Sequence, residues 1–452
     1  MDKEMIAIEN EILDNLVGKI SLMQDHEERK DVMFRVFLDV YNSPRGKALL
    51  KKVRGIELES FFNDFLSYGM IEELLNDPQV EDIMINSLGP IFIHNTGKGL
   101  IRFDKKFTSS DELNLFIRKL IIFSGRTDIR KINNVALYNV KGRVNIVFSP
   151  FGPQITVTRA KEKPLSVITL VNNGTLSFDI AAQLWLYVEG LGVKPANIII
   201  SGGPGTGKTT LLNALFSFIP EEDRIVIIED TLELNSDLEQ NCSRLESDEE
   251  VTTADLVKNS LRMRPDRVVV GEVRGTEAAD LMTAMNIGKY CMGTLHASTA
   301  RETIMRLENE PMNVPEVLIN LVDVFLIMRR FNIDGKINRV VGEMVESAGL
   351  EKKMVLLSSL WSFDYPTKQF VAAGVSSVYR DRLALVSGLT PKAIIEETKL
   401  RSAVLQTLAE QNISTIGAVT SFCRKYHSDK EGAFKDLGIS RQDLLLKAGQ
   451  IK

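Results

Sequence analysis

The chain has 452 residues, with 55 Lys and Arg against 60 Asp and Glu, which gives a formal net charge of −5. This length predicts roughly three domains, the composition is that of an ordinary globular protein, and the mild acidity argues against a protein that coats nucleic acid. The three cysteines are scattered along the chain, at Cys242, Cys291 and Cys423. Their number and spacing argue against a disulfide framework and a structural zinc site, and they fit a reducing compartment.

In the first part of the chain, the pattern of apolar residues changes from helical to mixed strand and helix near residue 66. Residues 1–66 are expected to be a helical N-terminal segment, because Leu13, Leu16 and Ile20 recur at helical spacing. Residues 67–165 contain short alternating runs separated by Gly and Asn, together with a helical pattern, and they predict a compact α+β domain. Strands are expected there at 81–85, 90–94, 100–103, 143–148 and 154–158, and a helix at 111–123.

Residues 166–345 alternate β-branched runs with helical patterns, which predicts a mostly parallel sheet with helices on both faces. Residues 346–388 are expected to be a β-rich extension. Residues 389–452 read as a helical C-terminal appendage, whose start is marked by Thr390 and Pro391. The strands expected in the parallel sheet are 197–201, 225–229, 267–271, 290–294 and 324–328.

The strongest motif is a phosphate-binding loop of the form G-x-x-x-x-G-K-[ST], which follows one predicted strand and opens a helix. Its glycines let backbone N–H groups turn inward around a phosphate, and the helix N-terminus adds positive potential there. Lys208 is expected to bridge the β- and γ-phosphates, and the Thr209 hydroxyl to hold Mg²⁺. The expected nucleotide-binding residues are Gly203, Pro204, Gly205, Thr206, Gly207, Lys208, Thr209 and Thr210.

Two other predicted strands end in carboxylates, which should approach the same nucleotide because ligands bind at the carboxyl ends of parallel strands. Glu272 suits a Walker-B role at Mg²⁺, and either Glu229 or Glu233 suits activation of the attacking water. For each strand alone, an exposed acidic loop is the competing interpretation. His296 follows a further strand and is a candidate γ-phosphate sensor, although a lone histidine is more often structural.

Four motifs, in this order, resemble those of the type II/type IV secretion ATPases, also called traffic ATPases. They are the phosphate loop at 202–209, an Asp-box-like segment at 229–234, a Walker-B-like segment at 264–274 and a His-box-like segment at 293–297. Further segments resemble archaeal archaellum and type IV pilus ATPases and tight-adherence pilus ATPases, at 80–86, 141–145 and 300–315.

The resemblance implies an α/β fold: a RecA-like P-loop NTPase core, preceded by the α+β domain and flanked by helical segments. It makes Glu233 the favoured catalytic base and Glu272 the Walker-B carboxylate. It also places Arg143 and Arg159 where N-terminal domains of the family reach the nucleotide phosphates. From composition alone these arginines would be surface strand residues, but a planar, permanently charged guanidinium suits the charge that develops on a γ-phosphate.

The sequence departs from the family pattern at three points. Lys289 stands where the family often has His, Ser298 stands where Asn is common, and the four-cysteine zinc insertion is missing. The role of position 289 is therefore open, and we expect a member of the zinc-free branch.

The resemblance further implies an ATPase that uses ATP and Mg²⁺ and works as a homo-hexamer at the cytoplasmic face of the cell membrane. It would move pilin-like subunits through a polytopic membrane platform protein, because closure of two domains around ATP, permitted by a linker at 161–164, can do mechanical work. The sequence contains no run of about 18 apolar residues, so it predicts no membrane-spanning helix. The machine itself, whether archaellum, adhesive pilus or secretion system, stays open.

Two alternatives remain at this stage. The first is a DNA-linked RecA-type motor, against which the acidic balance and the lack of basic stretches interleaved with aromatics both count. The second is a nucleotide-gated scaffold that barely hydrolyses ATP.

Overall fold

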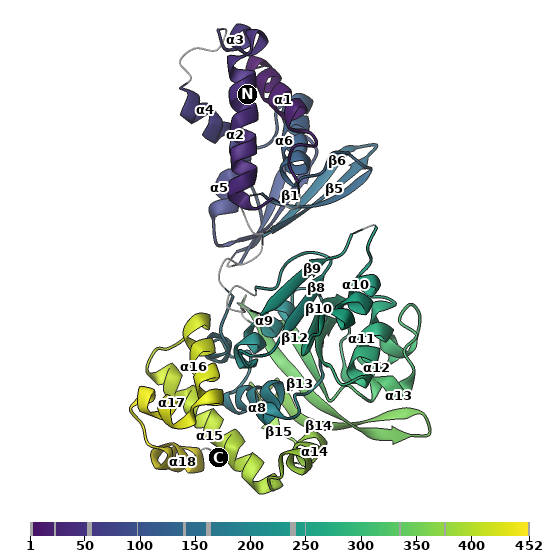
Figure 1. The fold of residues 1–452 in the computed structure, drawn as a ribbon, viewed down its shortest axis with the longest axis vertical. Helices are drawn as coiled ribbons and strands as arrows, with labels where there is room; N and C mark the ends of the chain where they lie inside the picture. The colour runs from purple at the N-terminus through teal and green to yellow at the C-terminus, as the bar shows by residue number, and fades with distance from the viewer. Residues whose placement is uncertain are drawn as a thin grey trace. The chain divides into compact units, whose positions relative to one another are not determined.

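The computed structural model divides the chain into two compact units, residues 1–162 and 163–452 (Figure 1). It describes residues 3–21, 24–51, 57–96, 98–138, 142–159, 164–235, 241–248, 250–333, 336–374 and 377–450. Within these ranges, no helix combines the length and the apolar character needed to cross a bilayer. The linker expected at 161–164 lies outside the described residues, apart from Pro164.

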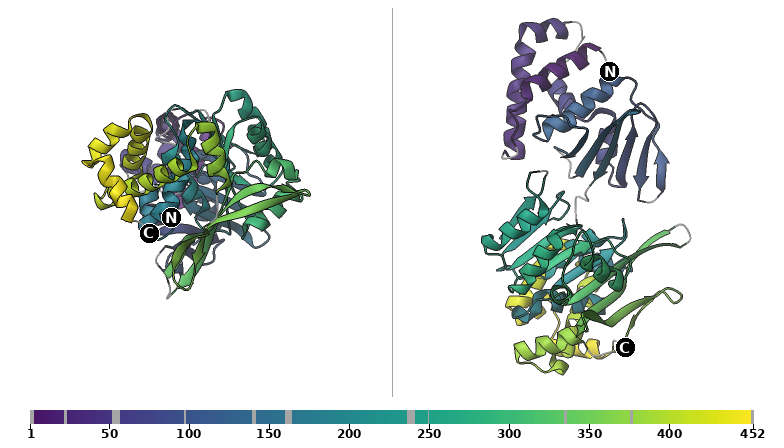
Figure 2. Two further views of the ribbon diagram at one scale, coloured as in Figure 1. Left: turned by 90° about the horizontal axis from the view of Figure 1, so that it is seen from below. Right: turned by 90° about the vertical axis from the view of Figure 1, so that its right-hand side faces the viewer.

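The N-terminal unit is an antiparallel six-stranded sheet with helices packed on one face (Figure 2). The strand order is β3-β2-β1-β6-β5-β4. The strands are β1 (Val80–Asn86), β2 (Ile91–Asn95), β3 (Gly99–Arg102), β4 (Ile132–Ala136), β5 (Gly142–Ser149) and β6 (Gly152–Arg159). The helices are α1 (Lys3–Leu16), α2 (His26–Asn42), α3 (Pro44–Leu50), α4 (Leu58–Leu66), α5 (Glu72–Asn76) and α6 (Ser110–Phe123).

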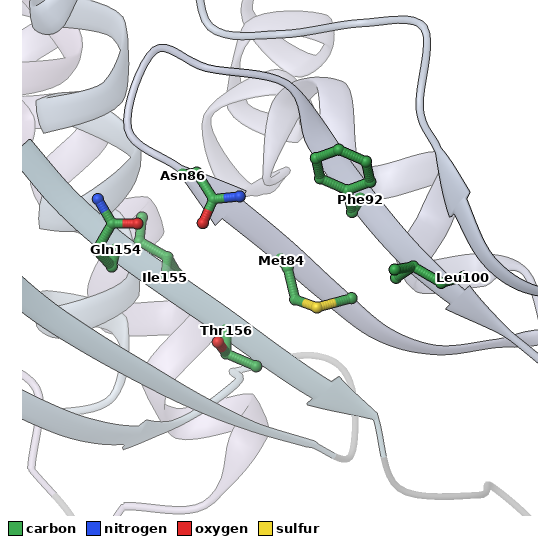
Figure 3. A pocket seen from close by; sticks show the side chains of 7 residues that line it. All are labelled: Met84, Asn86, Phe92, Leu100, Gln154, Ile155 and Thr156. Atoms are coloured by element: carbon green, nitrogen blue, oxygen red, sulfur yellow. The ribbon is translucent and has the colours of Figure 1, made fainter.

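Alternation along the strands explains why only one face of this sheet is covered. Ile83 and Ile85 point into a core that also contains apolar residues of α1, α2, α4 and α6, while Met84 between them faces the other way. The helices expected at 1–66 therefore share one hydrophobic core with the sheet that follows them. The opposite face carries a shallow pocket, lined among others by Met84, Phe92, Leu100 and Thr156 (Figure 3).

The C-terminal unit is built on a nine-stranded mixed sheet of order β15-β14-β13-β12-β7-β11-β10-β8-β9. The six strands from β12 to β9 run parallel, and β13, β14 and β15 add antiparallel ones. The strands are β7 (Ile198–Gly202), β8 (Ile225–Glu229), β9 (Cys242–Glu246), β10 (Arg267–Val273), β11 (Tyr290–Leu295), β12 (Val324–Ile333), β13 (Lys336–Glu351), β14 (Met354–Asp364) and β15 (Gln369–Ala372).

Helices cover both faces of the parallel part, which explains why its strands β7 and β8 are buried along their whole length. One apolar cluster joins the sheet to α7 (Val167–Asn172), α8 (Phe178–Glu189), α9 (Lys208–Leu215), α14 (Val378–Ser387), α15 (Pro391–Glu410), α16 (Ile416–Ser428), α17 (Lys430–Leu437) and α18 (Arg441–Gln450). The other cluster joins it to α10 (Thr253–Ser260), α11 (Glu277–Asn286), α12 (Ala300–Glu308) and α13 (Glu316–Ile319).

The C-terminal helices are tied to the sheet layer by a buried ionic cluster. Arg401 on α15 is fully buried and forms ion pairs with Glu189 of α8 at 2.5 Å and with Glu397 at 3.0 Å. Its guanidinium also lies 4.8 Å from the ring centroid of Trp185. Burial alone would raise the pKa of Glu189, but Arg401 and His427 lower it to about 2.

The structure differs from the segments expected between 324 and 388 in one respect. The boundary placed after residue 345 falls inside β13, a 16-residue strand that pairs with β12 on one side and β14 on the other. Sheet pairing across that point makes the β-rich extension a continuation of the nine-stranded sheet. Within the expected extension, β13 is followed by the strands β14 and β15, and the segment ends in a helix, α14.

Candidate functional site

The loop between β7 and α9 has the backbone of a phosphate cradle. Gly205 and Gly207 have φ values of 66° and 93°, in the left-handed region that glycine adopts without strain. A Cβ at Gly202 would lie 2.6 Å from Thr206 Oγ1 and 2.8 Å from the carbonyl oxygen of Met328, so the strand end accepts only glycine. The structure places all the nucleotide-binding residues expected from the sequence, 203–210, in this one loop and the first turn of α9.

Lys208 lies across the mouth of the cradle. Its Nζ donates hydrogen bonds to the carbonyl oxygens of Gly202 at 3.0 Å and Gly203 at 3.2 Å. Burial lowers the pKa of Lys208, and Glu272 and Glu233 partly oppose that effect. The N-terminus of α9 has no side-chain cap. A partly desolvated ammonium beside uncapped N–H groups is an environment that an anion stabilises, so the loop fits a phosphate chain.

A row of charged side chains continues from Lys208 along the carboxyl ends of the neighbouring strands. His296, just after β11, lies with Nδ1 3.4 Å from Lys208 Nζ and with Nε2 2.8 Å from Glu272 Oε1. The other oxygen of Glu272 accepts a hydrogen bond from Arg274 at 2.6 Å, and Arg274 forms an ion pair with Asp230 at 3.1 Å. The parallel register of β8, β10 and β11 therefore brings the acidic strand ends together beside the phosphate loop.

The environment of Glu272 and His296 shifts the pKa of both side chains. Burial alone would raise the pKa of Glu272, but Arg274, His296 and Lys208 outweigh it and leave that pKa below its usual value. Burial and the Lys208 charge lower the pKa of His296. At neutral pH the site thus holds an ionised Glu272 beside a neutral imidazole.

The residues proposed for Mg²⁺ also fit that ion. Glu272 Oε1 is buried and, in the part of the chain that the structure describes, has no hydrogen-bond donor assigned to it, although His296 Nε2 lies 2.8 Å away. Thr209 lies in the first turn of α9, next to Lys208. Nowhere in the described ranges do three or more His, Cys, Asp or Glu gather as a ready-made metal cage. One hydroxyl, one carboxylate, phosphates and water are the ligand set that Mg²⁺ commonly takes at such sites.

Glu229 and Glu233, the two candidates for the base, lie in different environments. Glu229 is 2% exposed, and its Oε1 accepts hydrogen bonds from the N–H groups of Glu233 and Leu234, both at 2.9 Å. Burial raises the pKa of Glu229 to about 7. Glu233 lies on the exposed loop that Glu229 holds in place. Glu229 is therefore positioned to fix the loop, while Glu233 is an exposed residue whose charge acts on Lys208 and Arg274.

Arg143 and Arg159 both belong to the N-terminal unit, on the paired strands β5 and β6. Arg143 lies opposite Thr158 in the ladder. Arg159 donates hydrogen bonds to the carbonyl oxygens of Asp77 and, at 3.2 Å, Val80, and its Nε is buried without a hydrogen-bond partner among the described residues. Arg159 thus has a structural attachment inside its own unit that the sequence did not reveal.

Asp230 and Arg274 lie within the Asp-box-like and Walker-B-like segments, and the structure adds both to the site through their ion pair. The signal was available, because Arg274 follows Glu272 by two residues at a strand end, which places both side chains on one side of the strand.

Known proteins are similar in sequence to the part of this chain that contains the candidate site. Residues 128–345 match the family model of "Type II/IV secretion system protein". The conjugal transfer protein TrbB of Rhizobium radiobacter is 30% identical over 278 residues, which cover 59% of this chain and 84% of TrbB. This chain belongs to the type II/IV secretion ATPase superfamily.

Two relatives from an archaeon are also similar to this chain, and one of them matches a longer stretch than TrbB does. An uncharacterized protein of Methanocaldococcus jannaschii is 32% identical over 368 residues, which cover 77% of this chain and 66% of that protein. A second protein of the same organism is 39% identical over 237 residues, and the chain spans only 32% of its length. Among solved structures, the pilus retraction motor PilT with bound ADP has 16% sequence identity and a TM-score of 0.46, with 84% of this chain and 96% of PilT covered.

Proposed function

We propose that this protein is an ATP-hydrolysing motor of a type IV pilus, archaellum or type II/IV secretion machine, built on a RecA-like P-loop core. The observation that carries the proposal is the continuous path from the phosphate cradle through Lys208 and His296 to Glu272. A phosphate loop next to an ordered carboxylate is the pair of features that nucleotide hydrolysis requires.

The residues of the C-terminal unit divide the chemistry among them. Lys208 exchanges its two loop carbonyls for the β- and γ-phosphate oxygens of ATP. Thr209 and Glu272 would hold Mg²⁺, which would supply positive charge against the phosphates. Glu233 orients the attacking water and accepts its proton, on a loop whose position Glu229 fixes through two backbone N–H groups. His296 links the Lys208 ammonium to Glu272, and it would sense the departure of the γ-phosphate.

The N-terminal unit supplies the mechanical response in this proposal. Arg143 and Arg159 bind the γ-phosphate side of the nucleotide in a closed arrangement and release it after hydrolysis. Differential affinity of this kind shifts a conformational equilibrium, whereas equal affinity for both states shifts nothing. We propose that the motor is a homo-hexamer at the cytoplasmic face of the membrane, where it acts on a polytopic platform protein and so on pilin-like subunits.

The test is ATP turnover by the purified full-length chain with Mg²⁺. Lys208→Ala is expected to abolish nucleotide binding and hydrolysis. Lys258→Ala is the matched control, because Lys258 is an exposed lysine whose ion pair with Asp280 lies on another part of the unit. Wild-type protein that holds no ATP would end the proposal.

A DNA-linked motor remains a second candidate, because TrbB and other relatives are described as conjugal transfer proteins. Single-stranded DNA should then stimulate ATP turnover, and the stimulation should fall steeply with salt. An ATP turnover rate that is unchanged by DNA, but that rises when membranes containing the platform protein are added, favours the pilus or secretion motor.

A further inference from the structure

A pair of arginines faces each other on the hairpin of β12 and β13. Arg330 and Arg339 are direct partners in the antiparallel register. Like charges directly opposite one another destabilise a strand pair. Throughout the described residues, neither guanidinium forms an ion pair with a carboxylate that would offset this cost. Among the described residues, the hairpin thus concentrates positive charge at one position without a carboxylate counter-ion.

Both side chains of this arginine pair, Arg330 and Arg339, lie against the phosphate loop. Arg339 Nε donates a hydrogen bond to the carbonyl oxygen of Gly205 at 2.9 Å. A guanidinium nitrogen of Arg330 lies 3.1 Å from the position that a Cβ on Gly205 would occupy, and Arg339 Cδ lies 3.6 Å from the corresponding position on Gly207. The two positive charges therefore lie beside Gly205 and Gly207 of the phosphate loop.

The order of the strands decides which end of a nucleotide this charge meets. β7 carries the phosphate loop at its carboxyl end, with β11 and β10 on one side and β12 on the other. Glu272 and His296, which belong to the γ-phosphate chemistry, follow from β10 and β11. The arginine pair approaches from the opposite side, so it faces the part of the phosphate chain that ADP and ATP share.

We propose that the arginine pair is a second anion-binding element of the nucleotide site, which holds the α- and β-phosphates of a nucleoside di- or triphosphate. This inference rests on the proposed nucleotide-binding function and adds two binding residues outside the phosphate loop. Guanidinium groups are suited to this role, because they are permanently charged and offer paired donors to phosphate oxygens.

The neighbouring arginine provides a matched control. Arg329 precedes Arg330, so its side chain leaves the opposite face of β12, where it lies 3.4 Å from Glu343. Arg329→Gln removes the same charge from the same hairpin without touching the phosphate loop.

The experiment measures the Kd of ADP and of a non-hydrolysable ATP analogue, together with kcat and KM for ATP, in the full-length chain. For Arg330→Gln and Arg339→Gln we expect both Kd values to rise about tenfold, as for the loss of one charge-assisted hydrogen bond. KM should rise in parallel while kcat stays within about threefold of wild type. Arg329→Gln should leave all four quantities unchanged, and Arg330→Lys should recover part of the affinity.

Thermal unfolding without nucleotide separates binding from a structural role. Removing one of two facing charges should leave the midpoint of Arg330→Gln equal to that of wild type or above it, since only the repulsion is lost. An unchanged Kd for ADP in both variants, or a loss confined to ligands that carry a γ-phosphate, would overturn the proposal. A wild-type chain that binds neither nucleotide would instead refute the proposed function itself.

Discussion

The imidazole of His296 stands between two groups of opposite charge, with Nε2 2.8 Å from Glu272 Oε1 and Nδ1 3.4 Å from Lys208 Nζ. A neutral ring in this position can respond to either neighbour. When Lys208 turns toward a phosphate, one side of the ring loses its contact, while the other still touches the carboxylate proposed for Mg²⁺. We therefore expect occupation of the cradle to affect the geometry of Glu272.

The coupling predicts a specific kinetic defect. His296→Ala should lower kcat about 10²-fold, as does removal of one positioned polar group in other active sites. The Kd for ADP should change little, because the phosphate loop and Lys208 remain. Stopped-flow binding and steady-state turnover measure the two quantities, and a kcat equal to that of wild type would contradict the coupling.

Substitution of the two candidate bases, Glu229 and Glu233, should affect kcat to different extents. Glu233→Gln is expected to reduce kcat by about 10²- to 10⁴-fold with ATP binding retained, because it removes the proton acceptor alone. Glu229→Gln preserves an oxygen that can accept from the N–H groups of Glu233 and Leu234, so its kcat should fall far less. If instead Glu229→Gln proves the more damaging change, the assignment of Glu233 is reversed.

Glu229 also predicts a pH dependence of stability. Its folded-state pKa of about 7 lies above the ordinary value of 4.5. The folded state therefore keeps a proton that the unfolded state loses, and this group's contribution is present below about pH 4.5 and lost as the pH rises toward 7.

The corresponding measurement compares Glu229→Gln with wild type. The neutral variant should gain relative stability between pH 5 and 8, by at most about 3 kcal/mol. Thermal unfolding across that range tests the sign. A difference in midpoint that stays flat with pH would show that Arg244, 3.6 Å from the carboxylate, compensates the buried charge.

The buried ionic cluster of the C-terminal helices predicts a strong and non-additive effect. Arg401→Leu should cost about 3–5 kcal/mol in the free energy of unfolding, because it leaves Glu189 buried without its main partner. The double variant Arg401→Leu with Glu189→Leu should recover much of that loss. Denaturant unfolding of both singles and the double variant measures the coupling, and simple additivity would exclude it.

Arg143 and Arg159 are both proposed to reach the nucleotide, so the loss of either should slow hydrolysis. Arg143→Gln is expected to lower turnover, because it removes a positive charge proposed to act on the γ-phosphate. Arg159→Ala should lower turnover and also the unfolding midpoint, because Arg159 donates to the carbonyl oxygens of Asp77 and Val80. ATP binding should stay near normal in both. Normal turnover in either variant would remove that arginine from the mechanism.

The sequence predicted the parts of the site that local chemistry specifies. The phosphate loop needs glycine at positions of positive φ, and Gly205 and Gly207 adopt that backbone. Carboxylates at strand ends follow from hydrophobic runs that stop at an acidic residue, as at Glu229 and Glu272.

The features that the sequence did not reveal depend on pairing between distant segments. Arg330 and Arg339 face each other because of the register between β12 and β13. Glu229 is buried because other strands pair with β8. β4 and β9 escaped prediction as well, because short strands at a sheet edge are only half buried and lack a continuous apolar run. Their positions follow from hydrogen bonding to β5 and β8.

The buried guanidinium of Arg401 also bears on how the molecule can be dissected. A fragment ending at residue 388 would omit α15 to α18 and expose to water the apolar surface of α8 that these helices cover. Such a piece should aggregate on expression. The place to separate the protein for biophysical work is the junction of its two units at residues 162 and 163, with everything from there to the last helix kept whole.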